Sequence, residues 1–402
     1  MKFCLLNNLY PPNARGGAEV IVELLINGLV KAGHQVLLIT STPEVKYAKE
    51  KIGENLQILR INPKNIYYLL EDKNQSSLKK IIFHSYDFFN TAFSKIALAE
   101  IDAFKPDVVL THNLKGIGLG IARKLQHKNY FQIHTLHDFQ LLDPHGSFWR
   151  AGVINPCQNI FYKSYRLFSR FFIGRPNVVI APSQFILNKH KEFGFFQNSV
   201  TQAIFNPLSN LNNQEQSEKK IDEIFTVLFL GQLTAHKGAE FLAKTFKKFI
   251  CPNAELLIVG GGEQLPLMRD LAKLDSRLKI LGQIDHDQLS VIFQKTDLLV
   301  VSTLSLDNSP TVIYEAYSFG VPVLVSDSGG SKELVKVDET GWVFKSGDEN
   351  DLLTKLNLVF DSREKLPILG KNGKKFAQDL TIDHYLERML VLCRNSIKSQ
   401  LN

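Results

Sequence analysis

Short apolar segments, each followed by a turn and then a helical pattern, recur along this chain in two separate halves. In the first half they are Lys2–Leu6, Val36–Thr40, Gln57–Ile61, Val108–Thr111, Gln132–Leu136 and Asn177–Ala181. In the second half they are Phe225–Leu230, Glu255–Val259, Lys279–Leu281, Leu298–Ser302 and Val323–Ser326. Strands that alternate with helices indicate parallel sheets covered by helices on both faces, so we predict an α/β fold with two such sheets.

A polar stretch separates the two halves. Residues 206–224 are rich in Asn, Gln and Lys and hold few apolar side chains, which is typical of a linker between domains. The 402 residues also exceed the roughly 250–300 at which one hydrophobic core usually stops growing. We therefore predict a domain over residues 1–205, a second domain over residues 225–380, and a C-terminal helix over residues 381–402 that packs back on the first domain.

Composition excludes several classes of protein. Four cysteines lie far apart without a C-x-x-C pair, so neither a disulfide framework nor a zinc site is indicated. No apolar run reaches the ~18 residues that span a bilayer, and the first residues lack the apolar core of a signal peptide, so we expect a cytoplasmic protein. The net charge of +7 is compatible with an anionic substrate or with an anionic membrane leaflet.

The most informative segment is Ser305–Pro322, with the sequence SLDNSPTVIYEAYSFGVP. Pro310 is expected at the first position of a helix that stops at Gly320. The N–H groups near Thr311 and Val312 would then form an anion site at the start of that helix.

Two acids lie in this segment with seven residues between them. Glu315, one turn into the helix, is placed to accept hydrogen bonds from a ribose hydroxyl pair, and Asp307 is placed to accept them from sugar hydroxyls. The alternative is an ordinary capped helix that carries two surface acids.

Glycine-containing loops follow the first strand of each half. In the second half the loop GQLTAHKG, at Gly231–Gly238, carries Lys237, whose charge can neutralise a leaving diphosphate. In the first half Gly16 and Gly17 precede a helix and would let backbone amides approach a phosphate or sugar closely. Each loop alone is also typical of an ordinary turn, but together with the acid pair they favour a ligand site.

The ordered combination resembles the retaining glycosyltransferases of family 4, which have the GT-B fold. The matching motifs run through the whole chain: GGAE at Gly16–Glu19, Gly33-His34, His137-Asp138, APS at Ala181–Ser183, the GQLTAHKG loop, GGG at Gly260–Gly262, the segment from Asp307 to Pro322, and Ser328-Gly329-Gly330. The resemblance implies two Rossmann-like domains that face a central cleft, with a nucleotide sugar bound there.

The resemblance also assigns roles to residues. It implies catalytic roles for His137 beside the donor sugar, Lys237 at the diphosphate and Asp307 at the sugar hydroxyls. It implies donor contacts at Gly16, Gly17, Gln232, Lys237, Asp307, Ser309, Thr311, Val312 and Glu315. No metal is expected, because a lysine and backbone dipoles replace the divalent cation in this family, and no other cofactor is implied. The alternative for His137 is a purely structural histidine at a strand end.

Two positions depart from the family pattern. The family usually has arginine where this chain has Gln232, so one of the two cations expected at the diphosphate is missing. Arg15 or His236 would have to replace that charge, or the donor site is weaker than usual. The family also usually has glutamate where this chain has Asp307, which keeps the charge but shortens its reach.

The activity implied by the resemblance is transfer of a hexose from a UDP- or GDP-sugar to a glycan or lipid-linked acceptor, with retention of configuration. The expected mechanism is front-face displacement, in which the leaving phosphate takes the acceptor proton. By analogy with other members of the family, bacterial surface-polysaccharide synthesis is the favoured biological process.

The segment FYKSYRLFSRFF at Phe161–Phe172 mixes Lys163, Arg166 and Arg170 with six aromatic residues. Such a helix would suit peripheral contact with the inner face of a membrane that holds a lipid-linked acceptor. The alternative is that its aromatic side chains pack in the core. No nucleic-acid partner is expected, because no RNA-recognition motif accompanies these aromatics.

Rival classes remain for the whole chain. One is an inactive homologue that binds a nucleotide sugar as a regulatory protein, and another is a GT-B epimerase or phosphorylase. A dinucleotide oxidoreductase would need a G-x-G-x-x-G turn after a strand, which neither the Gly16 loop nor the Gly260 loop supplies.

Overall fold

A computed structural model describes residues 1–13, 16–44, 48–150, 152–154, 159–208, 224–285 and 288–401. The chain divides into two compact units. Unit 1 comprises Met1–Ser147, Pro156–Ser209 and Ile382–Asn402, and unit 2 comprises Phe148–Asn155 and Asn210–Thr381. Residues 148–155 thus group with unit 2, although the sequence placed them inside the first domain. The predicted linker lies largely outside the described residues.

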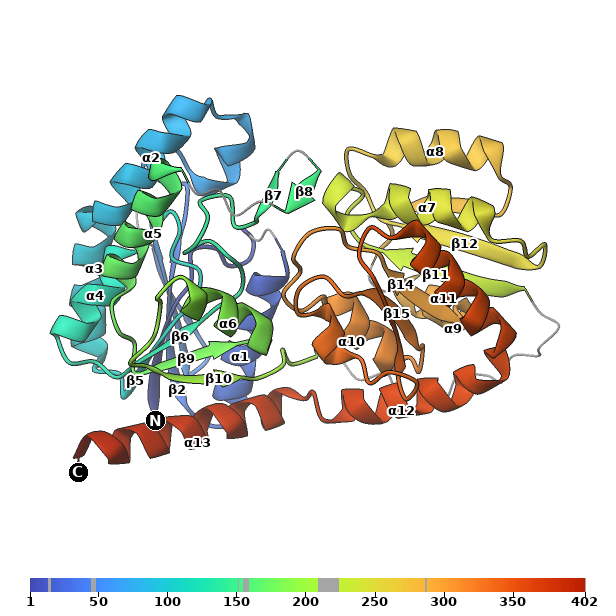
Figure 1. Cartoon of the computed structure of the whole chain (residues 1–402). Coiled ribbons are helices and arrows are strands. Elements are labelled where there is room, and N and C mark those ends of the chain that lie inside the picture. The colour runs from blue at the N-terminus through green and yellow to red at the C-terminus, as the bar shows by residue number, and fades with distance from the viewer. Residues whose placement is uncertain are drawn as a thin grey trace. The chain divides into compact units, whose positions relative to one another are not determined.

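Unit 1 contains an eight-stranded sheet with the order β10-β9-β6-β5-β1-β2-β4-β3 (Figure 1). Its strands are β1 (Lys2–Leu6), β2 (Gln35–Ser41), β3 (Ala48–Ile52), β4 (Leu56–Ile61), β5 (Val108–Thr111), β6 (Gln132–Thr135), β9 (Val178–Ala181) and β10 (Val200–Ala203). All pairs are parallel except β3 with β4. The central strands are buried along nearly their whole length, because helices cover both faces of the sheet, and this explains their unbroken apolar sequences.

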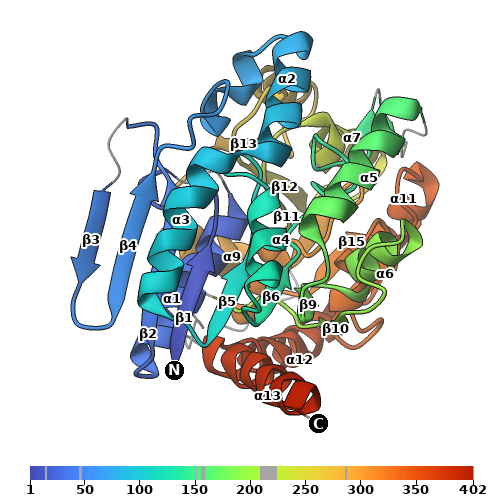
Figure 2. The same cartoon turned by 90° about the vertical axis from the view of Figure 1, so that its left-hand side faces the viewer.

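The outer strand of this sheet has a different character. The sequence of β3 is AKEKI, and Figure 2 shows the strand at the edge of the sheet, beside β4. Lys49, Glu50 and Lys51 are exposed there, and such charges discourage pairing with another chain. Because β3 has no buried apolar face, the hydrophobic pattern did not predict it.

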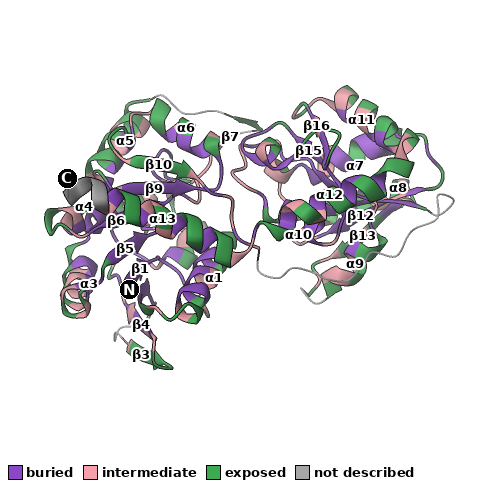
Figure 3. Cartoon of the chain, turned by 90° about the horizontal axis from the view of Figure 1, so that it is seen from below, coloured by how far each residue is buried: buried purple, intermediate pink, exposed green. Residues whose placement is uncertain are grey.

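The helices of unit 1 are α1 (Gly17–Lys31), α2 (Ser77–Phe89), α3 (Thr91–Phe104), α4 (Gly120–His127), α5 (Ile160–Ile173), α6 (Gln184–Glu192) and α13 (Ile382–Leu401), with a 3₁₀ turn η1 (Leu69–Asn74). Figure 3 shows the central strands of the sheet buried and the outer faces of several helices exposed. None of the helices in the described ranges combines the length and the apolar character that a bilayer span requires.

The last helix, α13, belongs to the core of unit 1. Tyr385, Leu386 and Met389 are buried in the same cluster as residues of β1 and α1. The contact with α1 is close at Gly28, where an added Cβ would lie 2.6 Å from Ile382 Cγ1 and 2.9 Å from Leu386 Cδ1. A small residue is therefore required where the two helices cross.

Unit 2 contains a six-stranded parallel sheet with the order β13-β12-β11-β14-β15-β16. Its strands are β11 (Phe225–Leu230), β12 (Ala254–Val259), β13 (Leu278–Gly282), β14 (Leu298–Val301), β15 (Val323–Ser326) and β16 (Gly341–Phe344), and a short hairpin is formed by β7 (Trp149–Arg150) and β8 (Val153–Ile154). Its helices are α7 (Ala239–Lys248), α8 (Leu265–Leu274), α9 (Leu289–Lys295), α10 (Thr311–Ser318), α11 (Glu349–Asp361) and α12 (Leu366–Gln378), with 3₁₀ turns η2 (Ala235–Lys237), η4 (Ser331–Leu334) and η5 (Arg363–Lys365).

Both sheets have a topological switch point. In unit 1 the chain builds outward from β1 toward β2, and then returns to the other side of β1 with β5. In unit 2 it builds from β11 toward β12 and β13, and returns beside β11 with β14. Ligands of open α/β sheets bind outside the carboxyl ends of the strands at this point. The loops after β1 and β5, and those after β11 and β14, are therefore the places to look for a site.

Candidate active site

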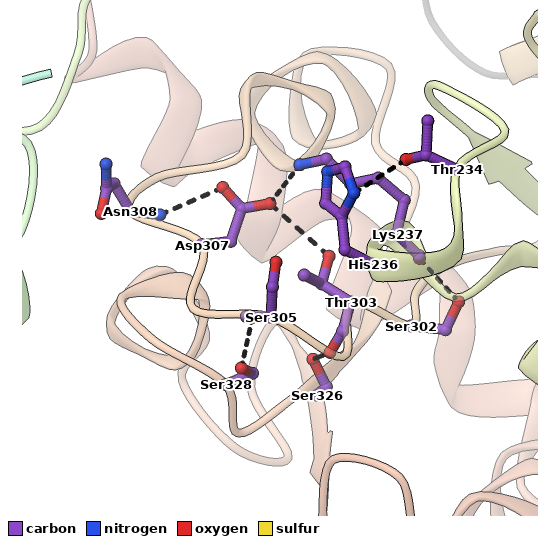
Figure 4. Close-up of polar contacts among 10 residues, drawn as sticks. All are labelled: Thr234, His236, Lys237, Ser302, Thr303, Ser305, Asp307, Asn308, Ser326 and Ser328. Atoms are coloured by element: carbon purple, nitrogen blue, oxygen red, sulfur yellow. Dashed lines mark hydrogen bonds and ion pairs between the residues drawn. The ribbon is translucent and has the colours of Figure 1, made fainter. Parts of the chain in front are cut away.

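An ion pair lies at the switch point of unit 2. Lys237 ends η2, which follows β11, and Asp307 lies in the loop after β14, the neighbouring strand. The Lys237 Nζ is 2.5 Å from Asp307 Oδ2 (Figure 4). The lysine side chain is 31% exposed and the aspartate 17%, so the pair stays within reach of a ligand from solvent. Two residues that are seventy positions apart in the sequence are thus brought into contact.

The backbone holds Asp307 in a fixed position. The N–H of Gly330 donates to the Asp307 carbonyl oxygen at 2.7 Å, and the N–H of Asn308 donates to Asp307 Oδ1 at 3.0 Å. Gly329 has a φ of +74°, and an added Cβ there would lie 2.1 Å from the Asp307 carbonyl oxygen. The glycine at this position therefore permits the close approach of the two loops.

Hydroxyl groups connect the loops around this pair. Ser302 Oγ donates to the Gly238 carbonyl at 2.9 Å, and Ser326 Oγ donates to the Thr303 carbonyl at 2.7 Å. The N–H of Leu304 donates to the carbonyl of His236 at 2.9 Å. These contacts tie the loop after β11 to the loop after β14 and the latter to β15. The sequence analysis did not identify them, because isolated serines carry no recognisable spacing.

The helix α10 begins at Thr311, directly after the Asp307 loop. Pro310 is the N-cap residue and not the first helical residue, which corrects the predicted start by one position. The first N–H groups of an α-helix have no partner within the helix, and Thr311 is exposed and Val312 half-buried. Glu315 lies one turn further and is half-buried. The anion site predicted at this helix start therefore has the required backbone.

Ser309 does not stand free in the loop. Its hydroxyl is hydrogen-bonded to the hydroxyl of Tyr314, a buried residue of α10. A role for Ser309 in donor binding would use the remaining hydrogen-bonding capacity of this group.

Neither residue near Lys237 supplies the missing second cation. Gln232 is exposed and uncharged. Burial, together with the neighbouring Lys237, lowers the pKa of His236 below its usual value, so this histidine is neutral at pH 7. Arg15, the other residue considered for this charge, lies outside the described residues.

In unit 1, Gly16 and Gly17 lie where α1 starts, in the segment after β1. Gly16 is the N-cap residue in an extended conformation, and its N–H donates to Glu19 Oε2 at 2.7 Å. Glu19 is buried, so the GGAE motif has a structural function as a helix start. The glycines also lack side chains that would screen the backbone from a ligand.

His137 pairs with a second histidine at the switch point of unit 1. His137 Nε2 lies 3.0 Å from Nδ1 of His112, which directly follows β5. Burial lowers the pKa of His137 to about 4 and that of His112 well below its usual value. Both rings are therefore neutral at pH 7. The N–H of one ring donates a hydrogen bond to the unprotonated nitrogen of the other. His112 was given no role from the sequence, although a histidine directly after a strand was a usable signal.

A small cavity of about 40 Å³ adjoins this pair, which is room for very few water molecules. Its lining includes Asp87, Lys115 and Asp138. Burial raises the pKa of Asp87 to about 7 and that of Asp138 to about 6. The sequence analysis missed Asp87 and Lys115, because nothing in their local pattern marks them.

The predicted site residues thus fall into two groups, one in each unit. Unit 1 brings together His137 and His112, and holds Gly16 and Gly17 at the start of α1. Unit 2 brings together Lys237, Asp307 and the first turn of α10. The donor-binding roles remain predictions, as does the central cleft. Within the described ranges, no group of three or more His, Cys, Asp or Glu side chains is arranged to hold a metal ion.

Two α/β units, each with a parallel sheet and polar residues at its switch point, define the GT-B class of folds. The family description "Glycosyltransferase Family 4" matches residues 15–207, and "Glycosyl transferases group 1" matches residues 211–376. The chain belongs to the family 4 glycosyltransferases. This confirms both the predicted family and the predicted fold class.

Several known proteins are similar to this chain. An uncharacterized 42.6 kDa protein in the cps region of Klebsiella pneumoniae is 29% identical over 343 residues, which cover 84% of this chain and 88% of that protein. Sucrose-phosphate synthase from Thermosynechococcus elongatus has a similar structure, with a TM-score of 0.74, 19% identity and 99% of both chains covered. Anabaena HepE, in complex with UDP-glucose, gives a TM-score of 0.63 with 18% identity over 100% of this chain and 99% of that chain. The two structures share the fold of this chain.

Proposed function

We propose that this glycosyltransferase moves a hexose from a UDP- or GDP-sugar to a glycan or lipid-linked acceptor, with retention of configuration and without a metal ion. The observation that carries the proposal is the position of Lys237, at the switch point of unit 2 and beside the loop that leads into α10. A lysine and the start of a helix together suit a diphosphate, because both stabilise negative charge.

The donor's parts would be divided among neighbouring residues. The diphosphate would lie against Lys237 and the first N–H groups of α10, at Thr311 and Val312. Glu315 would accept hydrogen bonds from the ribose hydroxyls, and Asp307 from hydroxyls of the transferred sugar. Gln232 and Ser309 would contribute uncharged hydrogen bonds at the same donor, and Gly16 and Gly17 of unit 1 would approach it through their backbone.

The ion pair between Lys237 and Asp307 suggests an exchange of partners on donor binding. In the structure the lysine is paired with the aspartate at 2.5 Å. A diphosphate would compete for the ammonium group, since two negative groups cannot both be neutralised by one cation. Asp307 would then be released from the lysine and would accept hydrogen bonds from sugar hydroxyls instead.

In the proposed reaction the acceptor hydroxyl attacks on the face from which the phosphate leaves. The bond from the anomeric carbon to the phosphate oxygen breaks first, and the leaving phosphate takes the acceptor proton. Lys237 and the start of α10 stabilise the charge that grows on the diphosphate. His137, which is neutral at pH 7, would hydrogen-bond the donor sugar and would not act as an acid.

Similarity to other proteins supports the choice of donor and of pathway. The similar structure of Anabaena HepE holds UDP-glucose. The relative from Klebsiella pneumoniae is encoded in a cps region. We therefore favour a UDP-sugar as donor and surface-polysaccharide synthesis as the process, at the inner face of a membrane where the acceptor is lipid-linked.

Donor binding can be tested by thermal stabilisation. A ligand that binds only the folded state raises the melting temperature, so UDP-glucose, UDP-galactose and GDP-mannose should be compared with the free nucleotides. We expect one nucleotide sugar to stabilise the wild type and Glu315→Ala to lose most of the shift. Glu364→Ala, an exposed acid on η5, is the matched control. Equal shifts in wild type and Glu315→Ala would refute the assigned site.

The rival functions differ in turnover. An inactive homologue would bind the donor but release no nucleoside diphosphate when acceptor glycans are added. A GT-B epimerase would convert the donor without an acceptor. We expect acceptor-dependent release of nucleoside diphosphate that is unchanged by EDTA, and loss of that release in EDTA would refute the metal-independent mechanism.

A further inference from the structure

Two neighbouring helices of unit 1 turn apolar faces toward solvent. In α2 the exposed apolar residues are Leu78, Ile81, Ile82, Tyr86 and Phe89. In α5 they are Ile160, Phe161, Leu167, Phe168 and Phe171. Their spacing places each set on one side of its helix, since residues three, four, seven and eleven positions apart share a face. A helix of a globular protein ordinarily buries its apolar side chains, but α2 and α5 carry apolar residues on an exposed face in addition to the buried Phe83, Phe88 and Ile173.

The helices α2 and α5 lie against one another in unit 1 (Figure 1), and aromatic side chains join them. Phe88 of α2 stacks on Phe172 of α5 at 5.7 Å between ring centroids and lies 5.9 Å from Phe168. Phe89 contacts Phe172 edge to face at 5.0 Å. The outward apolar residues therefore belong to a packed pair of helices and form one continuous surface, called here the α2–α5 face.

The sequence left two alternatives for α5, contact with a membrane or packing in the core. In the structure one side of the helix is exposed and the other side is buried. Tyr165 and Arg166 turn inward: the Tyr165 hydroxyl donates to the Gln140 carbonyl at 2.7 Å, and Arg166 Nε donates to the Leu142 carbonyl at 3.2 Å. Arg166 is buried and lies over the Phe193 ring. Lys163 and Arg170 are exposed. Arg166 is thus a structural residue and cannot report on binding at the surface.

A basic groove adjoins the end of the α2–α5 face. It has a volume of about 630 Å³, and its lining includes Arg123, Arg170 and Arg175 together with the apolar Leu167 and Phe171. No Asp or Glu occurs among the described residues that line it. Leu167 and Phe171 thus belong both to the groove and to the apolar face, so the charged site and the apolar surface are continuous.

One arginine of the groove is fixed in place. Arg123 Nη1 donates to the Phe171 carbonyl at 2.7 Å, and its guanidinium lies 4.1 Å from the centre of the Phe171 ring. This contact ties α4 to the end of α5. Arg170 and Arg175 are exposed beside it.

The exposed charges on helices α2, α4 and α5 have one sign. Lys79 of α2 and Lys163 of α5 are exposed within or beside the apolar face. Helices α2, α4 and α5 contain a single carboxylate, Asp87, and it is buried. An apolar face flanked by lysines and arginines is the pattern of a helix that lies in the interface of an anionic membrane.

We propose that the α2–α5 face and its basic groove dock unit 1 on an anionic phospholipid bilayer. The apolar residues enter the boundary between headgroups and acyl chains, and Arg170 and Arg175 bind lipid phosphates in the groove. The inference gives a location and a lipid chemistry to the membrane contact in the proposed function. It can be tested without donor or acceptor, so its failure and the failure of the transferase assignment are distinguishable.

The test is flotation of the full chain with two kinds of vesicle. One is pure phosphatidylcholine, and the other contains phosphatidylglycerol in addition. We expect the wild type to float with the second kind only, and to be released by high salt, because surface charges are screened. Wild-type protein that floats with neither kind, or equally with both, overturns the proposal.

Two variants test the basic groove and the apolar face separately. Arg170→Glu with Arg175→Glu should weaken partitioning about 25-fold or more, since each basic residue near the surface contributes roughly a fivefold factor. Leu78→Ser with Ile82→Ser and Leu167→Ser should weaken it through the apolar contact. Arg170→Lys with Arg175→Lys keeps the charge and should retain most of the binding. Unchanged flotation of the first two variants, at wild-type melting temperature, overturns the proposal.

Matched controls lie in unit 2. Leu274→Ser, Ile368→Ser and Lys371→Glu change exposed apolar and basic residues there, and flotation should be unchanged. Light scattering tests the alternative that the α2–α5 face is an interface between two copies of the chain. If the wild type is a dimer and the variant at Leu78, Ile82 and Leu167 is a monomer, that alternative is correct and the membrane proposal is wrong. All variants should keep the donor-induced thermal shift, because none of the substituted residues belongs to the proposed donor site.

Discussion

At the scale of single residues, Lys237 is the group on which the proposed donor binding depends most. Its partner Asp307 lies 2.5 Å away in the structure, and both side chains retain some exposure. Exposed and partly exposed ion pairs contribute only about 0–1 kcal/mol to stability. The pair is therefore better suited to ligand exchange than to holding the fold together.

Replacing Lys237 by alanine should remove binding with little loss of stability. The nucleotide-sugar thermal shift is expected to fall by most of its size, because the only charge near the diphosphate in the described part of the β11 loop is gone. The unliganded melting temperature should change little. Lys244→Ala is the control, since that lysine also pairs with an acid, Glu240, at 2.6 Å but lies on the outer face of α7. A full shift in Lys237→Ala would contradict the proposed site.

Gln232→Arg should strengthen donor binding. The substitution restores the charge that the family usually has at this exposed position, and one charge-assisted hydrogen bond contributes about 1.5 kcal/mol, or roughly a tenfold change in affinity. Isothermal titration with a nucleoside diphosphate measures the change. Gln232→Glu, of opposite charge, should weaken binding, and equal affinities for the two variants would show that this position does not face the phosphates.

Some candidate site residues could be singled out from the sequence, and others could not. Asp307, Glu315 and Lys237 lie in motifs with recognisable spacing, so each could be singled out. Their pairing could not, because the contact of Lys237 with Asp307 depends on β11 and β14 being neighbours in the sheet. His112 was given no role for the same reason: only strand order places it beside His137.

At the scale of elements, the loops at the switch point of unit 2 depend on close backbone approach. Gly329 and Gly347 have the same φ of +74°, but they differ in surroundings. An added Cβ at Gly329 meets the Asp307 carbonyl oxygen at 2.1 Å, whereas at Gly347 nothing lies within 4 Å.

Gly329→Ala should therefore cost much more stability than Gly347→Ala. Gly347→Ala adds only the strain of a left-handed backbone, roughly 1–2 kcal/mol. Gly329→Ala adds the same strain and must also displace the Asp307 loop. Urea unfolding gives both values, and the donor-induced thermal shift should be lost only in Gly329→Ala. Equal destabilisation by the two substitutions would show that the loop moves without cost.

Burial explains which elements could be predicted. Strands such as β1, β11 and β15 are buried on both faces, so their apolar sequences gave the correct bounds. β3 and β10 lie at the two edges of their sheet and are largely polar or exposed, and they were missed. The buried edge strand β16 was missed as well, because only three apolar residues follow its glycine and such a run is too short to recognise. The outward faces of α2 and α5 could not be predicted either, because an apolar stripe ordinarily indicates a core contact.

At the scale of the whole molecule, unit 1 carries an unusual number of buried titratable groups. The pKa is lowered by burial at His84, His112, His134, His137 and His190. It is raised by burial at Asp87 and Asp138. These two sets have opposite effects on the pH dependence of folding.

Unit 1 should lose stability as the pH falls from 7 to 5. A histidine with a lowered pKa stays neutral in the folded state but takes up a proton near pH 6.5 when unfolded, so acid favours the unfolded state. The two aspartates bind protons in the folded state at pH values where unfolded aspartate does not, which opposes this trend. The destabilising effect of the five histidines is larger than the stabilising effect of the two aspartates, so the melting temperature should fall. A melting temperature that stays constant or rises between pH 7 and 5 would contradict this prediction.

The position of α13 has a consequence for how the chain is made. Tyr385, Leu386 and Met389 complete the core of unit 1, yet the ribosome adds them only after the whole of unit 2. The first unit therefore cannot finish folding while the second is being translated, and its uncovered apolar surface beside α1 must be tolerated or shielded during that time. A nascent chain interrupted anywhere in unit 2 is left defective in unit 1 as well.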